Sequence, residues 1–118
     1  MLAVPVLLAG TSAGNAATIG ASAKITPAQQ SAITGQTVTW ATSWGTSGHF
    51  YQVVFTFGDG QSAMLGDTPS TSATFAHSFT SCAKKTYTQT LQAQDLATGL
   101  IYSATATTAV SPGTACRA

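Results

Sequence analysis

Side chains able to support acid–base, nucleophilic or metal chemistry are scarce in this sequence of 118 residues. The carboxylates are Asp59, Asp67 and Asp95, there is no Glu, and the imidazoles are His49 and His77. General acid–base catalysis needs two such groups held together, and no G-x-S-x-G, H-E-x-x-H or D-x-D-x-D-G pattern places candidates in one segment. We therefore expect a protein that is not an enzyme and has no metal site and no cofactor.

Charge is equally sparse. Charged residues make up 6% of the chain, against about 25% in an average soluble protein. The net charge is +1 and the only basic cluster is Lys84–Lys85, which is too little for the phosphate contacts of nucleic-acid binding or for attraction to anionic membranes. With 21 Thr and 12 Ser, the composition favours an all-β protein outside the cell, with no nucleic-acid partner.

Apolar and polar residues alternate with period two along most of the chain, which indicates β-strands with one buried face. Gly and Asp between them mark turns, and the clearest of these is Gly58-Asp59-Gly60, where Asp59 can bond to its own downstream backbone. About seven short strands without helical periodicity predict a β-sandwich formed by residues 18–118. The expected strands are 18–26, 36–43, 50–57, 61–65, 71–79, 87–94 and 101–110.

Four aromatic residues, Trp40, Trp44, Phe50 and Tyr51, lie on or near two of these strands. At strand spacing such residues are core residues more often than not, and we favour that interpretation. The alternative is an exposed aromatic platform for sugars.

The two cysteines, Cys82 and Cys116, are an even number in a small chain that composition places outside the cell, which predicts one disulfide. Cys82 precedes the strand that starts near Tyr87, and Cys116 follows the strand that ends near Val110. Adjacent antiparallel strands would bring both cysteines to one end of the sandwich. Two free buried thiols are the alternative.

Residues 1–17 form a separate region, an apolar run followed by a small-residue linker. The run is too short to span a bilayer as a helix, which takes about 20 residues, so we expect no stable membrane span. As a strand it would be apolar on both faces, which favours burial in a neighbouring subunit. A cleaved signal peptide is the alternative. The donor-strand residues would be Leu2, Val4, Val6, Leu7 and Leu8.

Three segments together resemble the PKD domain, an Ig-like antiparallel β-sandwich of cell-surface and secreted proteins. They are Phe55-Thr56-Phe57-Gly58-Asp59-Gly60, Ala76-His77-Ser78-Phe79 and Thr86-Tyr87-Thr88-Gln89-Thr90-Leu91. The sequence departs from the family pattern at Phe55 and Phe79, where the family has Trp and Tyr. The resemblance implies structural roles for the motif residues Gly58, Asp59, Gly60, His77, Phe79 and Tyr87: Asp59 ties down a turn, and His77 packs with Phe79 at a strand end.

Members of that family serve as spacers, adhesive modules or filament subunits and are not catalytic on their own. Two functions follow for this chain. The first is an extracellular structural subunit that polymerises with other copies of itself into a pilus-like filament, using residues 2–10 as the donor strand. The alternative is a secreted or cell-surface module that binds a surface glycan or a protein. In that case the N-terminal segment is a signal peptide that is cleaved.

Overall fold

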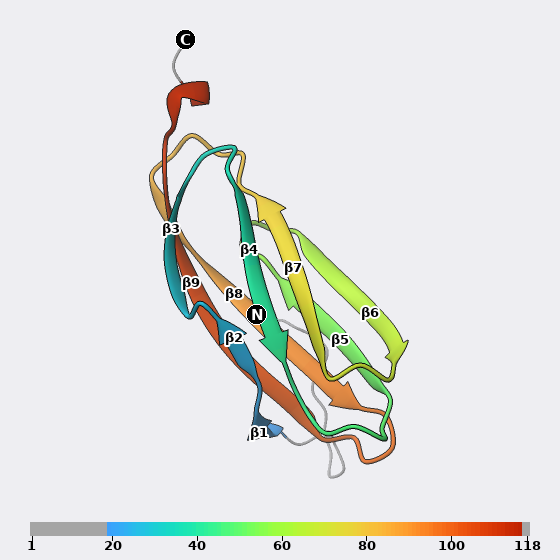
Figure 1. The fold of residues 1–118 in the computed structure, drawn as a ribbon. Helices are drawn as coiled ribbons and strands as arrows, with labels where there is room; N and C mark the ends of the chain where they lie inside the picture. Colours follow the sequence, from blue (N-terminus) through green and yellow to red (C-terminus); the bar gives the residue numbers. More distant parts are fainter. Residues whose placement is uncertain (1–18, 117–118) are drawn as a thin grey trace.

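The computed structural model describes residues 19–116, which form two β-sheets packed face to face (Figure 1). Within this part of the chain, no helix is long and apolar enough to cross a membrane. The elements are β1 (Ile19–Ser22), β2 (Lys24–Thr26), β3 (Gln29–Ile33), β4 (Thr37–Ser43), β5 (Tyr51–Thr56), β6 (Ser62–Thr68), β7 (Ser72–Ser78), β8 (Lys85–Asp95), β9 (Ile101–Ser111) and the 3₁₀ turn η1 (Thr114–Cys116).

The larger sheet has the strand order β1-β9-β8-β5-β6, with β3 also paired to β9, and the smaller sheet has the order β2-β4-β7. The long hairpin of β8 and β9 forms the middle of the larger sheet, in register from Lys85↔Val110 to Gln94↔Ile101. The β-sandwich that the alternation predicts is therefore confirmed.

The segment expected as one strand over residues 18–26 is two strands in different sheets. β1 pairs with β9 in the larger sheet, whereas β2 pairs antiparallel with β4 in the smaller one. Ala23 lies at the crossing and still donates its N–H to Ser103 O at 2.9 Å. Alternation continues through the crossing because Ile25 is buried between the sheets, so the sequence carries no signal of the change.

A further strand, β3, lies where no strand was expected. It pairs with β9 in register from Gln29↔Thr107 to Ile33↔Ser111. Both β1 and β3 run parallel to β9, so the sandwich is not antiparallel throughout. β3 begins with two Gln and a Ser, residues without the apolar alternation that reveals a strand, and it exists because β9 offers unpaired backbone groups along its outer edge.

Aromatic side chains dominate the space between the sheets. The Trp40 ring lies 5.4 Å from that of Phe55 and 5.6 Å from that of Phe57. Trp40, Trp44 and Tyr51 are buried, as the core interpretation predicts, whereas Phe50 is 54% exposed. Three of the four aromatic residues are therefore unavailable as a sugar platform.

The polar side chain of Gln89 is fully buried in this core. Its Nε2 donates to Phe57 O at 2.8 Å, and its Oε1 accepts from Thr108 Oγ1 at 3.0 Å. These bonds offset the cost of burying the amide and join β8 to β9 and to the end of β5. The proposed donor-strand residues Leu2, Val4, Val6, Leu7 and Leu8 lie outside the described residues.

Candidate functional site

The turn that follows β5 begins the candidate site. Gly58 and Gly60 have φ of +95° and +93°, in the left-handed region where residues with a Cβ are disfavoured. A Cβ on Gly58 would lie 2.5 Å from Thr88 O, whereas Gly60 faces open space. The Asp59 Oδ1 accepts from the N–H of Gln61 at 3.1 Å, which is the turn bond expected from the sequence.

The other oxygen of this carboxylate contacts a histidine on β7. The Asp59 Oδ2 lies 2.7 Å from Nε2 of His77, and the two side chains are only 18% and 13% exposed. The His77 ring stacks on Phe57 with 4.1 Å between centroids and meets the edge of Phe79 at 5.0 Å. The imidazole is therefore held on three sides, which suits a structural partner of the turn.

Phe79 continues this packing to the start of β8, because its ring stacks on that of Tyr87 at 4.5 Å. The three segments that carry the resemblance thus meet at one end of the sandwich. The structure brings together Gly58, Asp59, Gly60, His77, Phe79 and Tyr87.

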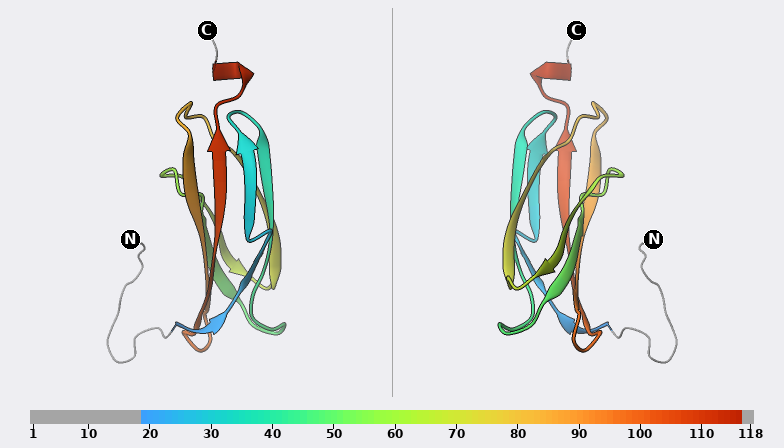
Figure 2. Two further views of the ribbon diagram at one scale, coloured as in Figure 1. Left: turned by 90° about the vertical axis from the view of Figure 1, so that its left-hand side faces the viewer. Right: turned by 90° about the vertical axis from the view of Figure 1, so that its right-hand side faces the viewer.

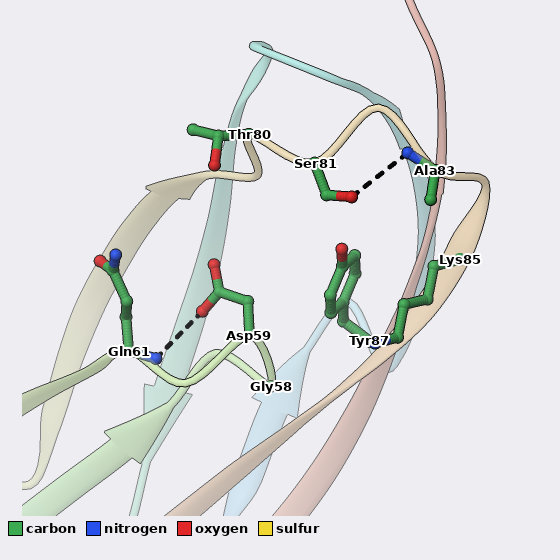
Figure 3. Close-up of a pocket in the computed structure, with 8 residues that line it drawn as sticks. All are labelled: Gly58, Asp59, Gln61, Thr80, Ser81, Ala83, Lys85 and Tyr87. Atoms are coloured by element: carbon green, nitrogen blue, oxygen red, sulfur yellow. Dashed lines mark hydrogen bonds between the residues drawn. The ribbon is translucent and has the colours of Figure 1, made fainter.

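A hollow of about 410 Å³ opens beside these residues, between the turn after β5, the β7–β8 loop and the start of β8 (Figure 3). Ala83 and four polar residues of the lining are not predicted as site residues from the sequence, because single hydroxyl, amide or ammonium groups have no distinctive spacing. The four polar residues are Gln61, Thr80, Ser81 and Lys85. The lining residues are Gly58, Asp59, Gln61, Thr80, Ser81, Ala83, Lys85 and Tyr87.

The loop on the far side of the hollow is held by several bonds. Ser81 O accepts from Thr34 Oγ1 at 2.8 Å, and Ser81 Oγ accepts from the N–H of Ala83 at 3.2 Å. Cys82 forms the predicted disulfide with Cys116, with 5.6 Å between the Cα atoms. The disulfide joins this loop to η1, which follows β9, so the loop that borders the hollow is covalently linked to the C-terminal segment.

A second pair of histidine and carboxylate lies at the opposite end. His49 Nδ1 is 2.7 Å from Asp95 Oδ2. Burial raises the pKa of Asp95, but the N–H groups of Ala97 and Thr98 and the His49 ring outweigh it, so the pKa is lowered overall. Asp95 thus caps the turn between β8 and β9. Among the described residues no three His, Cys, Asp or Glu side chains gather as metal ligands.

No family model matches this sequence, and no curated protein matches it. Among solved structures, the chain is similar to the PKD domain of an M14-like peptidase from Thermoplasmatales archaeon SCGC AB-540-F20, with a TM-score of 0.61 and 19% sequence identity. The similarity covers 76% of this chain and 93% of that one. The similarity in structure and the meeting of the three motif segments at one end of the sandwich identify the fold of this chain as PKD-like.

Proposed function

We propose that this chain is an extracellular, non-catalytic binding module, secreted or held at a cell surface. The observation that carries the proposal is a PKD-like sandwich whose disulfide, Cys82–Cys116, has an exposed Cys82. Exposed disulfides persist in oxidising compartments and are reduced in most cytosols. The similar solved structure is a PKD domain of a peptidase, which supports a non-catalytic, accessory role for this chain.

The titratable groups support a non-catalytic role. Each of the two His–Asp pairs has its carboxylate engaged by backbone N–H groups, at Gln61 for Asp59 and at Ala97 for Asp95. Within the described residues, neither imidazole has a hydroxyl or thiol partner that it could activate as a nucleophile. Both pairs therefore serve as turn anchors.

Surface labelling of intact cells tests this proposal. An amine-reactive biotin reagent that cannot cross membranes should label the exposed Lys84 and Lys85 before lysis, or the protein should be recovered from the medium. Electrophoresis after blocking free thiols should show the disulfide formed. Labelling only after lysis, together with free thiols, would contradict an extracellular location.

A filament subunit is the second candidate, and two observations support it. Among the described residues, β6 pairs only with β5 and β7 only with β4, so each leaves an edge at which an extended segment can add. Figure 2 also shows β1 and η1 at opposite ends of the long axis, an arrangement suited to end-to-end assembly. The donor strand would be residues 2–10, with other copies of this chain as partners.

N-terminal sequencing and negative-stain microscopy of the native protein test the filament. A retained N-terminus with filaments supports it, and the double variant Val6→Asp, Leu8→Asp should then give folded single subunits. A mature chain that begins near Ala17 and forms only single particles leaves the binding module as the function.

A further inference from the structure

Tyr87 is a buried tyrosine whose hydroxyl lacks a partner in the part of the chain that the structure describes. Its ring is part of the core, with 4% of the residue exposed, but its hydroxyl oxygen is not one of the buried polar atoms that lack a partner, so this end of the side chain is open to a ligand. The contrast is Tyr51, whose hydroxyl donates to Thr46 O at 2.8 Å and accepts from the N–H of Thr46 at 2.9 Å. The Tyr87 hydroxyl instead points into the hollow beside Asp59 (Figure 3).

Other polar groups line the same hollow. Figure 3 shows the Asp59 carboxylate, the Thr80 hydroxyl and the Tyr87 hydroxyl around one space, with Ser81 above the Tyr87 hydroxyl in this view. Tyr and Thr hydroxyls both donate and accept, and each carboxylate oxygen can accept more than one hydrogen bond. Asp59 therefore keeps acceptor capacity beyond its bonds to Gln61 and His77.

The charges around the hollow nearly cancel. Asp59 carries one negative charge, and the Lys85 Nζ lies 5.3 Å from the centroid of the Tyr87 ring. With one acidic and one basic residue in its lining, the hollow has no net charge that would attract a strongly anionic or cationic ligand, which suits a neutral one. The faces of the Tyr87 ring are occupied by Phe79 and Lys85, so the site offers hydrogen bonds and no aromatic stacking surface.

We infer that this hollow binds one ring of a neutral sugar, with its hydroxyls bonded to Asp59, Thr80 and Tyr87. A polyhydroxylated ring matches mixed donors and acceptors without net charge, and about 410 Å³ lies near the lower end of ligand pockets, about 300–1,000 Å³. A peptide strand would add along a free strand edge, and over residues 85–89 β8 pairs with β9 but not with β5, so a peptide is the competing ligand that the titration has to exclude. The inference rests on the proposed binding module and names its ligand class.

Titration followed by ¹H–¹⁵N NMR tests this site, with the methyl glycosides of α-D-mannose, β-D-glucose and β-D-galactose as probes. At least one should give saturable shifts confined to residues 58–61 and 80–87, with a Kd of about 1–10 mM, the range expected for a few hydrogen bonds. Gly-Ser-Gly serves as the peptide probe.

Variants assign the binding to the hydroxyls. Tyr87→Phe removes only the hydroxyl and should weaken binding about three- to tenfold while leaving the thermal midpoint unchanged, since one neutral hydrogen bond is lost to the ligand. Thr80→Val should act in the same direction. Tyr102→Phe, at a half-buried tyrosine outside the hollow, should bind as wild type does.

Three outcomes would overturn the inference. The first is no saturable shift from any glycoside up to about 100 mM, a concentration at which even weak specific binding is detected. The others are shifts at another surface, or binding of Gly-Ser-Gly in this hollow in place of the sugars. If any of these outcomes occurs but intact cells are labelled, the proposal of an extracellular binding module is still supported. A positive sugar titration with labelling only after lysis would contradict the location alone.

Discussion

Gly58 occupies a position where the backbone and its surroundings both exclude a side chain. Its φ of +95° is unfavourable for other residues, and a Cβ would lie 2.5 Å from Thr88 O on the neighbouring strand. Gly58→Ala should lower the free energy of unfolding by about 2–4 kcal/mol, combining the backbone cost with the overlap.

Gly60 is the matched control, because it has a similar φ of +93° but open space around it. Gly60→Ala should cost only about 1 kcal/mol, the backbone component. Urea unfolding of the two variants measures the difference. Equal losses would show that the approach to Thr88 imposes no constraint.

The pKa shift of Asp95 predicts how the free energy of unfolding depends on pH. Because its pKa is lowered in the folded state, the unfolded chain binds the proton first as the pH falls. Its contribution is therefore fully present above the unfolded pKa of about 3.9 and is lost as the pH falls through the lower folded value.

Thermal unfolding between neutral and strongly acidic pH tests this dependence. Asp95→Asn should be less stable at pH 7 and should lose less stability on acidification than wild type. Asp67→Asn, at an exposed position, controls for the removal of one negative charge. If Asp95→Asn lost as much stability on acidification as wild type does, the acid sensitivity would come from other groups.

At the scale of elements, Gln89 joins three strands through its buried amide. Gln89→Met keeps the volume but leaves Phe57 O and Thr108 Oγ1 without their partner, so the free energy of unfolding should fall by about 2–4 kcal/mol. Gln92→Met, on the opposite face of β8, should change it by less than about 1 kcal/mol.

A double-mutant cycle separates this network from packing. Thr108→Val also removes the hydroxyl that bonds to Gln89. The double variant Gln89→Met, Thr108→Val should lose less stability than the two single losses added, because the orphaned hydroxyl is gone. Additive losses in chemical denaturation would mean that the bond between these side chains contributes nothing of its own.

For the whole molecule, the disulfide closes a loop between Cys82 and Cys116, 34 residues apart. Replacing both cysteines with Ser should lower the free energy of unfolding by about 4 kcal/mol, because the unfolded chain regains the entropy of the open loop. Circular dichroism should still show the sandwich, because the aromatic core lies between the sheets. A loss below about 1 kcal/mol would show that the disulfide does not constrain the unfolded chain.

The sequence alone determined the sandwich and its interior. Alternation along β4 and β5 identifies the face with Trp40 and Phe55, because side chains of a strand point to opposite faces. The turn at Asp59 and the pairing of Cys82 with Cys116 were also predictable, since Gly and Asp have local conformational preferences and a two-cysteine chain has one possible disulfide.

Features that depend on residues distant in sequence are visible only in the folded structure. Whether residues 19–26 belong to one sheet or two, and whether the polar β3 is a strand, depends on the backbone groups that β9 leaves unpaired. Gln89 was not predicted as a buried residue because its burial requires Phe57 and Thr108 to meet it. The hollow has the same origin: Asp59 lies 21 residues before Thr80 and 28 before Tyr87, and no local sequence pattern indicates that their oxygens meet around one space.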